Sequence, residues 1–471
     1  MTPAAARFPL EPSPDELEAQ TRAVADFVLA QLRGLAEQPS FDLDGAEALR
    51  AAFDEDPPER ATSLQALLDR LKPAIAKSYN TAGPGYLAYI PGGGVYAAAL
   101  ADFIACAVNR YVGVAQAAPA LASIEETVAT WLCRLMGLPS GARGILTSGG
   151  SLSSFSAVVT ARHERLGEAF QDGVLYFSEE THYCVAKAAR LAGFPSASLR
   201  ALPTDTRFRL RPEALRDAIR DDRVRGKRPF LVVANVGTTN TGAIDPLPEL
   251  ALIAREHGLW LHADAAYGGF FRLAPGGEAR LWGIEACDSI TLDPHKGLFL
   301  PYGLGALLVR DGAALARVHR EGASYVQDVT HAGSLGFADL SPELSRDFRG
   351  LRLWLPLMLH GLGAFREQLE EKLALARWAY RELSSDPHFE LVDEPQLSVV
   401  AFRLRVPAEA ADRLGPELLR RVNARKRVFL SSTRIHGRYT LRICVLSFRT
   451  HAERVKDAID ALREEARALL G

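Results

Sequence analysis

Residues 259–269 read Leu-Trp-Leu-His-Ala-Asp-Ala-Ala-Tyr-Gly-Gly, an apolar run that ends in an acid and then in small residues. The apolar run predicts a buried β-strand, and the small residues predict a turn that another group can approach closely. Asp264 is therefore expected at the carboxyl end of a strand. There a carboxylate can bind a metal ion, a ribose hydroxyl or a protonated ring nitrogen. An aspartate that only caps the next turn explains this stretch equally well.

Other short apolar runs flank this strand along the chain, and helical stretches separate most of them. The expected strands are 144–146, 174–177, 230–235, 260–263, 289–292 and 306–309. Apolar strands that lack strict alternation and are separated by helices predict a mostly parallel sheet with helices on both faces. Such an open, doubly wound α/β domain binds its ligands at the carboxyl ends of its strands.

The same patterns divide the 471 residues into three parts. Residues 1–80 are expected to form a helical segment that begins with a capping box at Ser13 and Glu16 and has no core of its own. Residues 81–365 are expected to form the large α/β domain. Residues 366–471 are expected to form a small α+β domain.

Helices are expected at both ends of the small domain. The first covers residues 365–383, and the last follows a second capping box that runs from Thr450 to Glu453. Between these helices, strands are expected at 397–404, 428–430 and 440–445.

The composition excludes several classes of protein. The chain has 55 Lys and Arg against 57 Asp and Glu, a formal net charge of −2, so no basic excess exists to neutralise a nucleic-acid backbone. Its five cysteines are scattered and form no CxxC pair, which gives no metal framework and suits a reducing compartment. The sequence shows no secretory signal and no run of about 18 apolar residues. We therefore expect a cytoplasmic protein without a membrane span.

A second strand is expected to deliver a lysine to the same edge of the sheet. Residues 289–297 read Ser-Ile-Thr-Leu-Asp-Pro-His-Lys-Gly, so His295 and Lys296 follow the strand. A lysine between a strand end and a glycine has little room to extend along the surface, and a buried lysine is costly unless its charge is used or suppressed. Lys296, one of eight lysines in the chain, is therefore a candidate for covalent chemistry. The alternative is a surface lysine in a loop.

A glycine- and serine-rich turn predicts an anion site. Residues 144–154 read Gly-Ile-Leu-Thr-Ser-Gly-Gly-Ser-Leu-Ser-Ser and continue into an apolar helix. Backbone N–H groups and hydroxyls meet there at the positive end of a helix dipole, which suits a phosphate. The stretch is neither GxGxxG nor GxxxxGK[ST], so dinucleotides and P-loop nucleotides are disfavoured.

A histidine follows another of the expected strands. Residues 178–183 read Ser-Glu-Glu-Thr-His-Tyr, which places His182 at the start of a helix and at the same edge of the sheet. There an imidazole can stack on a planar ligand, or it can only cap the helix.

All four stretches suit one ligand, which must carry a phosphate, an aromatic ring with a basic nitrogen, and an aldehyde for the lysine. Pyridoxal 5′-phosphate (PLP) has each of these groups. With these motifs the chain resembles the PLP-dependent group II amino-acid decarboxylases, the family of the aromatic-L-amino-acid, histidine, glutamate and sulfinoalanine enzymes. The resemblance covers nearly the whole chain, from Gly85-Tyr-Leu-Ala-Tyr-Ile-Pro91 through Asn235-Val-Gly-Thr-Thr239 to Phe348-Arg-Gly-Leu-Arg-Leu-Trp354.

The resemblance implies the fold, the activity and the site residues. It implies the PLP-dependent transferase fold of type I, decarboxylation of an amino acid, and a homodimer in which the two N-terminal segments wrap each other. Lys296 would bind the cofactor covalently, Asp264 would pair with its pyridine nitrogen, and His182 would stack on its ring. The other implied cofactor contacts are Gly150 and Ser151 at the phosphate and Thr239, Ala266 and His295 elsewhere. The implied substrate pocket contains Tyr89, Pro91 and Tyr302.

Phe337, Met358 and Leu152 depart from the family pattern, and Phe337 is the departure that bears on the reaction. A flexible loop of the family often carries a catalytic tyrosine that returns a proton to the Cα of the substrate, and a gap-free alignment of residues 335–349 places Phe337 there. Because phenylalanine has no proton to give, O2 could react instead and yield an aldehyde, ammonia and peroxide as well as CO2. With a shifted alignment, Tyr325, His331 or a water supplies the proton. We expect an amine and CO2 as the main products.

Other classes of enzyme differ from this pattern at defined residues. A Rossmann-type dehydrogenase needs GxGxxG after its first strand, which the glycines at 83, 85 and 92–94 do not provide. A catalytically silent relative would lack Lys296 or Asp264, and both are present. An aminotransferase or a carbon–carbon lyase is not distinguished by these motifs. The stretch around Tyr89 and Pro91 resembles the aromatic enzymes of the family more than the glutamate enzymes. The resemblance therefore implies an aromatic substrate, which such a pocket would bind by stacking and apolar burial, and it leaves histidine open.

Overall fold

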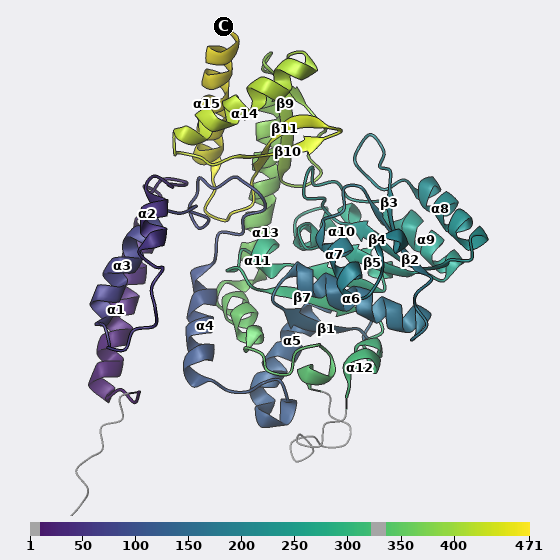
Figure 1. The fold of residues 1–471 in the computed structure, drawn as a ribbon, viewed down its shortest axis with the longest axis horizontal. Coiled ribbons are helices and arrows are strands. Elements are labelled where there is room, and N and C mark those ends of the chain that lie inside the picture. Colours follow the sequence, from purple (N-terminus) through teal and green to yellow (C-terminus); the bar gives the residue numbers. More distant parts are fainter. Residues whose placement is uncertain (1–9, 322–335) are drawn as a thin grey trace, which may run out of the picture.

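The computed structural model describes residues 10–321 and 336–471 (Figure 1). Its large sheet has the strand order β1-β7-β6-β5-β4-β2-β3. The strands are β1 (Arg143–Thr147), β2 (Gly173–Ser178), β3 (Leu199–Leu202), β4 (Arg228–Asn235), β5 (Trp260–Asp264), β6 (Ser289–Leu292) and β7 (Gly305–Val309). Among these seven, β7 alone runs antiparallel to its neighbours. The expected mostly parallel α/β sheet is therefore confirmed.

Both faces of this sheet are buried, which explains the apolar runs without alternation. In β2, Val174 and Tyr176 belong to the core on one face, whereas Leu175 and Phe177 belong to the core on the other. The first face is covered by α5 (Pro119–Leu135), α8 (Pro212–Val224), α9 (Leu247–His257) and the first half of α13 (Arg349–Ser384). The second face is covered by α6 (Gly150–Leu166), α7 (Cys184–Leu191) and α12 (Ala313–His319). Two short helices, α10 (Gly277–Arg280) and α11 (Pro294–Gly297), lie in connections between strands.

The six strands expected from the sequence are all present, and β3 is the one that the sequence did not reveal. Its four residues read Leu-Arg-Ala-Leu, and only Leu202 is buried. A short, half-exposed strand at the edge of the sheet carries no apolar run, so the pattern that identified the central strands is missing there.

The C-terminal part forms a second, antiparallel sheet with its own core, in the strand order β10-β11-β9-β8. Its strands are β8 (Phe389–Leu391), β9 (Val399–Leu404), β10 (Ser431–Ile435) and β11 (Arg438–Cys444), and its helices are α14 (Ala408–Ala424) and α15 (Ala452–Leu470). The second half of α13 also packs on this core. This helix begins well before the expected residue 365, and Gly361 interrupts it with φ 70° and ψ 154°.

Two expectations for this part are wrong. Residues 428–430 do not pair within the small sheet, because Phe429 instead exchanges backbone hydrogen bonds with Gly85 and Leu87 at 2.9 Å each. The apolar residues there join the two domains. The last helix is capped at His451 without a side-chain bond, and Thr450 instead donates its hydroxyl to the Pro84 carbonyl oxygen at 2.8 Å.

The helices of the N-terminal segment project away from the large domain (Figure 1), and the segment contacts the small domain through the Ser40 N–H, which donates to the Lys426 carbonyl oxygen at 2.8 Å, and through the ion pair of Asp42 with Lys426 at 2.9 Å. Its helices are α1 (Pro14–Arg33), α2 (Ala46–Ala51) and α3 (Leu64–Ala76), and α4 (Tyr96–Val108) follows against the large domain. The first capping box is confirmed, since the Glu16 N–H donates to Ser13 Oγ at 3.3 Å and the Ser13 N–H donates to Glu16 Oε2 at 2.8 Å. Neither α1 nor α2 contains a buried residue, and α3 contains one, Leu68.

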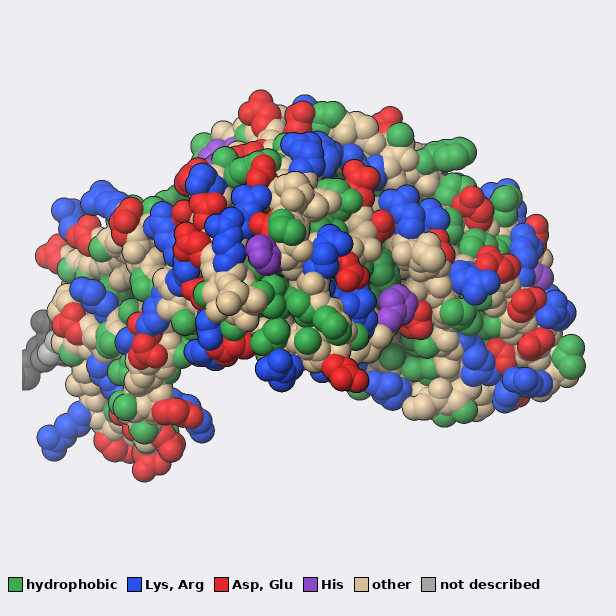
Figure 2. All heavy atoms as spheres, turned by 90° about the horizontal axis from the view of Figure 1, so that it is seen from above, with side chains coloured by type: hydrophobic (Ala, Val, Ile, Leu, Met, Phe, Trp, Pro, Cys, Tyr) green, Lys and Arg blue, Asp and Glu red, His purple; other side chains and the backbone are tan. Residues whose placement is uncertain are grey.

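The surface shows no large field of one charge on the face drawn in Figure 2, where acidic and basic side chains are interspersed. In the described ranges, no helix has the combined length and apolar character that a membrane crossing requires.

Candidate active site

One cavity at the carboxyl ends of the strands contains all eight residues that the sequence suggested as cofactor contacts. They are Gly150, Ser151, His182, Thr239, Asp264, Ala266, His295 and Lys296. These residues follow β1, β2, β4, β5 and β6, so the parallel topology brings distant parts of the chain to one edge of the sheet. The cavity measures about 260 Å³.

The turn between β1 and α6 is built to expose backbone N–H groups. Gly149 adopts φ 149°, which a side chain would disfavour, and directs the chain into the first turn of α6 at Gly150. Thr147 Oγ1 fixes this turn, because it contacts Ser153 Oγ at 2.8 Å and accepts the Gly149 N–H at 3.3 Å. The N-terminus of a 17-residue helix thus opens on the cavity, as a phosphate site requires.

Asp264 is a buried carboxylate that forms no ion pair within residues 10–321 and 336–471. It ends β5, is 9% exposed and accepts the Ala266 N–H at 3.3 Å. Burial raises its pKa, while Lys296, the Ala266 N–H and His182 act in the opposite direction. Among the described residues no ion pair forms with this carboxylate. A buried acid that faces a cavity in this state fits a ligand with a protonated nitrogen.

Lys296 lies in the short helix α11, and its ammonium group is paired with Asp293. The Lys296 Nζ is 2.9 Å from Asp293 Oδ2. Burial lowers the pKa of Lys296, but the attraction of Asp293 and Asp264 outweighs it, so the pKa is raised. His295 is fixed beside it, since its Nδ1 lies 2.7 Å from the Leu304 carbonyl oxygen.

His182 lies between the end of β2 and α7, where its Nδ1 accepts the Cys184 N–H at 3.3 Å. Burial lowers its pKa, the negative charge of Asp264 opposes this, and the neighbouring Lys296 acts in the same direction as burial. A neutral imidazole that lines the cavity can cover a flat ring without adding charge to it.

Several lining residues were not identified from the sequence. They are Ser148, Gly149, Cys184, Asn235, Gly237, Thr238, Tyr267 and Asp293. Asn235 follows an apolar run just as Asp264 does, so its position at a strand end was the available signal. Its side chain is held from behind by Asp245, which accepts both the backbone N–H and the Nδ2–H of Asn235 at 2.6 and 2.9 Å. Burial raises the pKa of Asp245 to about 6.

The small domain fixes one wall of the cavity. Arg442 in β11 donates from Nε to the Asn240 carbonyl oxygen at 3.0 Å and from Nη2 to the carbonyl oxygen of Thr239. The Tyr267 hydroxyl contacts Ser398 Oγ at 2.8 Å. The loop that carries Thr239 is therefore held by Arg442 of the small domain.

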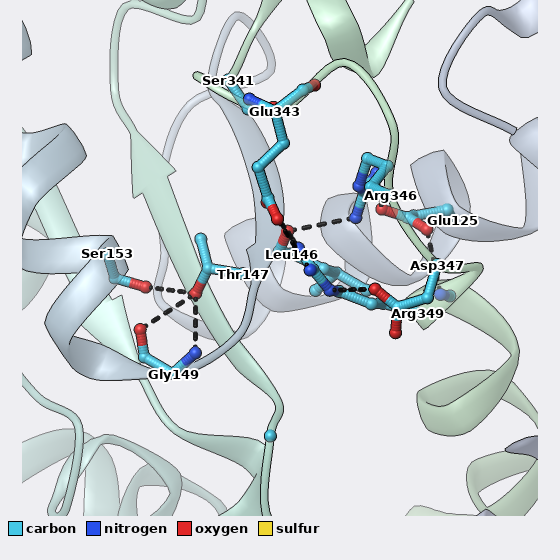
Figure 3. A network of polar contacts seen from close by, with 12 residues as sticks. Glu125, Leu146, Thr147, Gly149, Ser153, Ser341, Glu343, Arg346, Asp347 and Arg349 are labelled. Atoms are coloured by element: carbon cyan, nitrogen blue, oxygen red, sulfur yellow. Dashed lines mark hydrogen bonds and ion pairs between the residues drawn. The ribbon is translucent and has the colours of Figure 1, made fainter. Parts of the chain in front are cut away.

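A buried ionic network ties the β1 edge to the segment before α13 (Figure 3). Arg346 and Arg349 both donate to the Leu146 carbonyl oxygen, at 3.1 and 3.2 Å. Arg346 also pairs with Glu125 of α5 at 2.5 Å, and Arg349 pairs with Glu343 at 2.6 Å. Burial raises the pKa of Glu125, and Arg346 opposes this. Because Leu146 precedes the phosphate turn by two residues, this network holds the strand that leads into the turn.

The three expected substrate-pocket residues do not line this cavity. Tyr302 comes near it, with its ring centroid 5.8 Å from that of His295, and it is 60% exposed. Tyr89 is 57% exposed and adopts φ 55°, whereas Pro91 is buried. Pro91 is buried because the next residue, Gly92, packs directly on the backbone of His295.

Phe337 also lies outside the cavity of its own chain. It begins the 3-10 helix Phe337–Asp339, is 4% exposed and packs under the Arg346 guanidinium, 5.0 Å from its ring centroid. It lines a different hollow, beside Ala129 and Leu340. The alternative proton donors Tyr325 and His331 lie outside the described residues.

The fold and the cavity together define a PLP enzyme of fold type I. The model of the pyridoxal-dependent decarboxylase conserved domain matches residues 46–405, and the chain belongs to this family. It is a PLP-dependent carboxy-lyase.

The chain is similar over its whole length to named relatives. It is 33% identical to the aromatic-L-amino-acid decarboxylase of Bacillus atrophaeus, with 97% of each chain covered. The solved structure of Oryza sativa TDC with PLP and tryptamine superposes with a TM-score of 0.94 at 26% identity and covers 99% of this chain and all of that one. The structure of Rhodiola rosea 4-hydroxyphenylacetaldehyde synthase superposes with a TM-score of 0.91 at 26% identity and covers 98% of this chain and all of that one.

Proposed function

We propose that the protein decarboxylates an aromatic L-amino acid to the corresponding amine and CO2. The observation that supports this most directly is the convergence of the Lys296 amine, the Asp264 carboxylate and the Gly150 turn on one cavity. An amine, an acid and an anion site are the three groups that hold PLP by its aldehyde, ring nitrogen and phosphate.

Each side chain then has a distinct task. Bound PLP supplies a ring that accepts the electrons of the bond that breaks. Lys296 provides the amine that binds the aldehyde, and Asp264 stabilises the positive charge of a protonated ring nitrogen. His182 covers the ring, and the Gly150 and Ser151 N–H groups bind the phosphate. Since the site orients the bond to be broken and needs no strong base, its task is positioning and electrostatics.

Aromatic side chains near the site support an aromatic substrate. Tyr302 lies beside His295, and the exposed Tyr89 follows a buried aromatic cluster in which Tyr86 stacks on Phe429 at 5.6 Å. Relatives that share the fold are named for aromatic amino acids. A substrate panel of L-tyrosine, L-tryptophan, L-phenylalanine and L-glutamate tests this. Turnover of glutamate alone would contradict it.

The burial of Phe337 favours the amine over the aldehyde. A ring held under Arg346 in a different hollow is not placed beside Lys296 of the same chain, so its lack of a hydroxyl has no evident effect on that cavity. Both product classes occur among similar proteins, which include a phenylacetaldehyde synthase of Arabidopsis thaliana that is 28% identical. The second candidate function is therefore decarboxylation with oxidative deamination to the aldehyde.

Product stoichiometry separates these candidates. The amine reaction releases one CO2 per amine and consumes no O2, whereas the aldehyde reaction consumes O2 and releases ammonia and peroxide. We expect Phe337→Tyr to leave the amine product unchanged. We expect Tyr325→Phe to divert it towards the aldehyde. Wild-type O2 uptake that Phe337→Tyr abolishes would establish the aldehyde reaction instead, and a keto acid without CO2 would indicate an aminotransferase.

We also propose that the protein is a homodimer. Large apolar side chains are exposed on α3, α4 and α13 rather than scattered singly; they are Leu67, Leu71, Ile75, Leu100, Phe103, Ile104, Val108, Met358, Leu359 and Leu362. Exposed apolar surface of this extent indicates a partner surface, and an obligate homodimer interface usually buries more than about 2,000 Å². Light scattering should give twice the chain mass of 51.2 kDa.

A pair of variants tests which surface forms the dimer. Phe103→Asp on α4 should release monomers with reduced activity. The control is Val224→Asp, on α8 at the other end of the molecule, which should stay dimeric (Figure 1). A fully active wild-type monomer at micromolar concentration would contradict the proposal.

A further inference from the structure

Asp293 is a buried acid that no part of the proposed chemistry yet uses. It follows β6, its side chain is 2% exposed, and its Oδ2 lies 2.9 Å from Lys296 Nζ and 3.7 Å from His295 Nε2. Its Oδ1 is buried and has no hydrogen-bond partner among the described residues. A carboxylate with one oxygen on an amine and the other unsatisfied is costly unless it has a task in the site.

The carboxylate is confined to this place by the phosphate turn. A Cβ built on Gly150 would lie 3.0 Å from Asp293 Oδ2, so Asp293 is wedged between that turn and Lys296. The short helix α11 starts at Pro294 and fixes the spacing of the acid and the lysine, because it sets them one helical turn apart.

Other titratable groups face the amine from several elements. Electrostatic interactions couple the pKa of Lys296 to five groups besides Asp293. They are Asp264 at the end of β5, His182 before α7, Cys184 in α7, Tyr302 after α11 and Cys444 in β11. Of the acids near Nζ, Asp293 makes the ion pair, whereas Asp264 acts at longer range. Asp293 is therefore the group best placed to exchange a proton with the amine.

We propose that Asp293 is the proton partner of Lys296. Asp293 holds the free amine of Lys296 protonated and in place whenever the lysine is not bound to PLP. This inference rests on the proposed role of Lys296. A protonated amine cannot attack an aldehyde, so attachment requires one Nζ–H bond to break and an Oδ2–H bond to form across the 2.9 Å contact. The products are a neutral amine and a neutral carboxyl group, and no charge leaves the cavity. In reverse, Asp293 stabilises the lysine that a substrate amine has displaced.

Removal of the acid should make the free lysine more reactive at neutral pH. Opposite charges 2.9 Å apart attract by more than the equivalent of one pKa unit even at the dielectric constant of water. In the cofactor-stripped full-length protein, Asp293→Asn should therefore increase the rate at which a small amine-reactive reagent labels Lys296 by about tenfold or more. The exposed Lys456 serves as the internal standard in peptide mapping.

A matched control lies at the other end of the same strand. Asp288 precedes β6 and accepts the Leu261 N–H at 2.8 Å, so Asp288→Asn alters the same strand without touching the lysine and should leave the labelling rate unchanged. Asp293→Glu should keep the slow labelling. If Lys296 is labelled equally fast in the wild type and in Asp293→Asn, the inference is overturned.

The holoenzyme provides a second measurement in case the stripped variant does not fold. The holoenzyme is titrated with a simple amine, such as methylamine, which displaces Lys296 from the cofactor. The visible absorbance of the lysine-bound cofactor reports how much amine the displacement requires. At neutral pH Asp293→Asn should require about tenfold more amine, because the displaced, protonated lysine has lost its partner. An unchanged requirement contradicts the inference. Neither measurement uses an amino-acid substrate, so failure of the proposed function would show in the substrate panel alone.

Discussion

Substitution of Gly92 by alanine tests whether the segment after Pro91 sets the position of the catalytic lysine. A Cβ at Gly92 would lie 2.1 Å from the His295 carbonyl oxygen and 3.3 Å from the Lys296 carbonyl oxygen. Real Cβ contacts are not shorter than 3.0 Å, so the two backbones must separate by about 0.9 Å. Both atoms at the clash belong to the backbone or to Cβ, so no side chain can rotate out of the way.

The expected loss follows from that displacement. Overpacking of a close contact costs roughly 1–3 kcal/mol of stability, and a 1 Å misplacement of a reacting group can lower the rate about 100-fold. We expect Gly92→Ala to fold, to retain PLP less tightly and to decarboxylate about 100 times more slowly. Steady-state kinetics, PLP content and urea unfolding measure the three effects.

Gly94→Ala is the matched control within the same run of glycines. Gly94 adopts φ 70°, which disfavours alanine by about 1–2 kcal/mol, but no atom lies within 4 Å of the added Cβ. This variant should lose stability and keep its rate within a few-fold of the wild type. A Gly92→Ala protein with wild-type rate and PLP content would refute the idea that this backbone contact positions Lys296.

Three further changes test the buried ion pair of Glu125, the neutral state of His262 and the covalent role of Lys296. Glu125→Gln leaves the buried Arg346 without its ion-pair partner and should cost about 3–5 kcal/mol of unfolding free energy. The control Glu47→Gln, in an exposed ion pair, should cost less than about 1 kcal/mol. Equal losses in urea unfolding would contradict the role of the network. Burial lowers the pKa of His262 to about 3, so between about pH 6.5 and 3 only the unfolded chain binds a proton at this residue. The free energy of unfolding should therefore fall as the pH falls through this range, by up to roughly 1.4 kcal/mol per pH unit. His262→Gln should reduce that slope, and an unchanged slope would show that His262 is not kept neutral. Lys296→Ala should abolish the covalent attachment of PLP, and spectroscopy would detect any that remained.

The parts of the fold that the sequence revealed are those where one physical rule acts alone. Strands buried on both faces need apolar residues at every position, so β5 and β6 could be located closely. Asp264 stood out because it ends an apolar run and small residues follow it, and Lys296 stood out because it follows another such run within four residues and precedes a glycine. The glycine-rich turn at Gly150 was visible because a helix start and small residues coincide there.

The remaining features depend on contacts between distant segments. Phe429 looked like a strand residue, but its backbone pairs with Gly85, which no local pattern reveals. The sequence assigns Asp293 no role, because its pairing with Lys296 requires the helical turn of α11. Phe337 was placed by a gap-free alignment, whereas packing under Arg346 decides where its ring lies.

Borohydride reduction followed by peptide mapping tests the central claim most directly, because it fixes the cofactor on whichever lysine holds it. The chain has eight lysines, and the structure brings Lys296 to the cavity that also contains Asp264 and the Gly150 turn. We predict that the phosphopyridoxyl group is found on the peptide that contains Lys296 and on no other. Stoichiometric label on a different lysine, or a Lys296→Ala variant that is labelled and decarboxylates as the wild type does, would contradict the account.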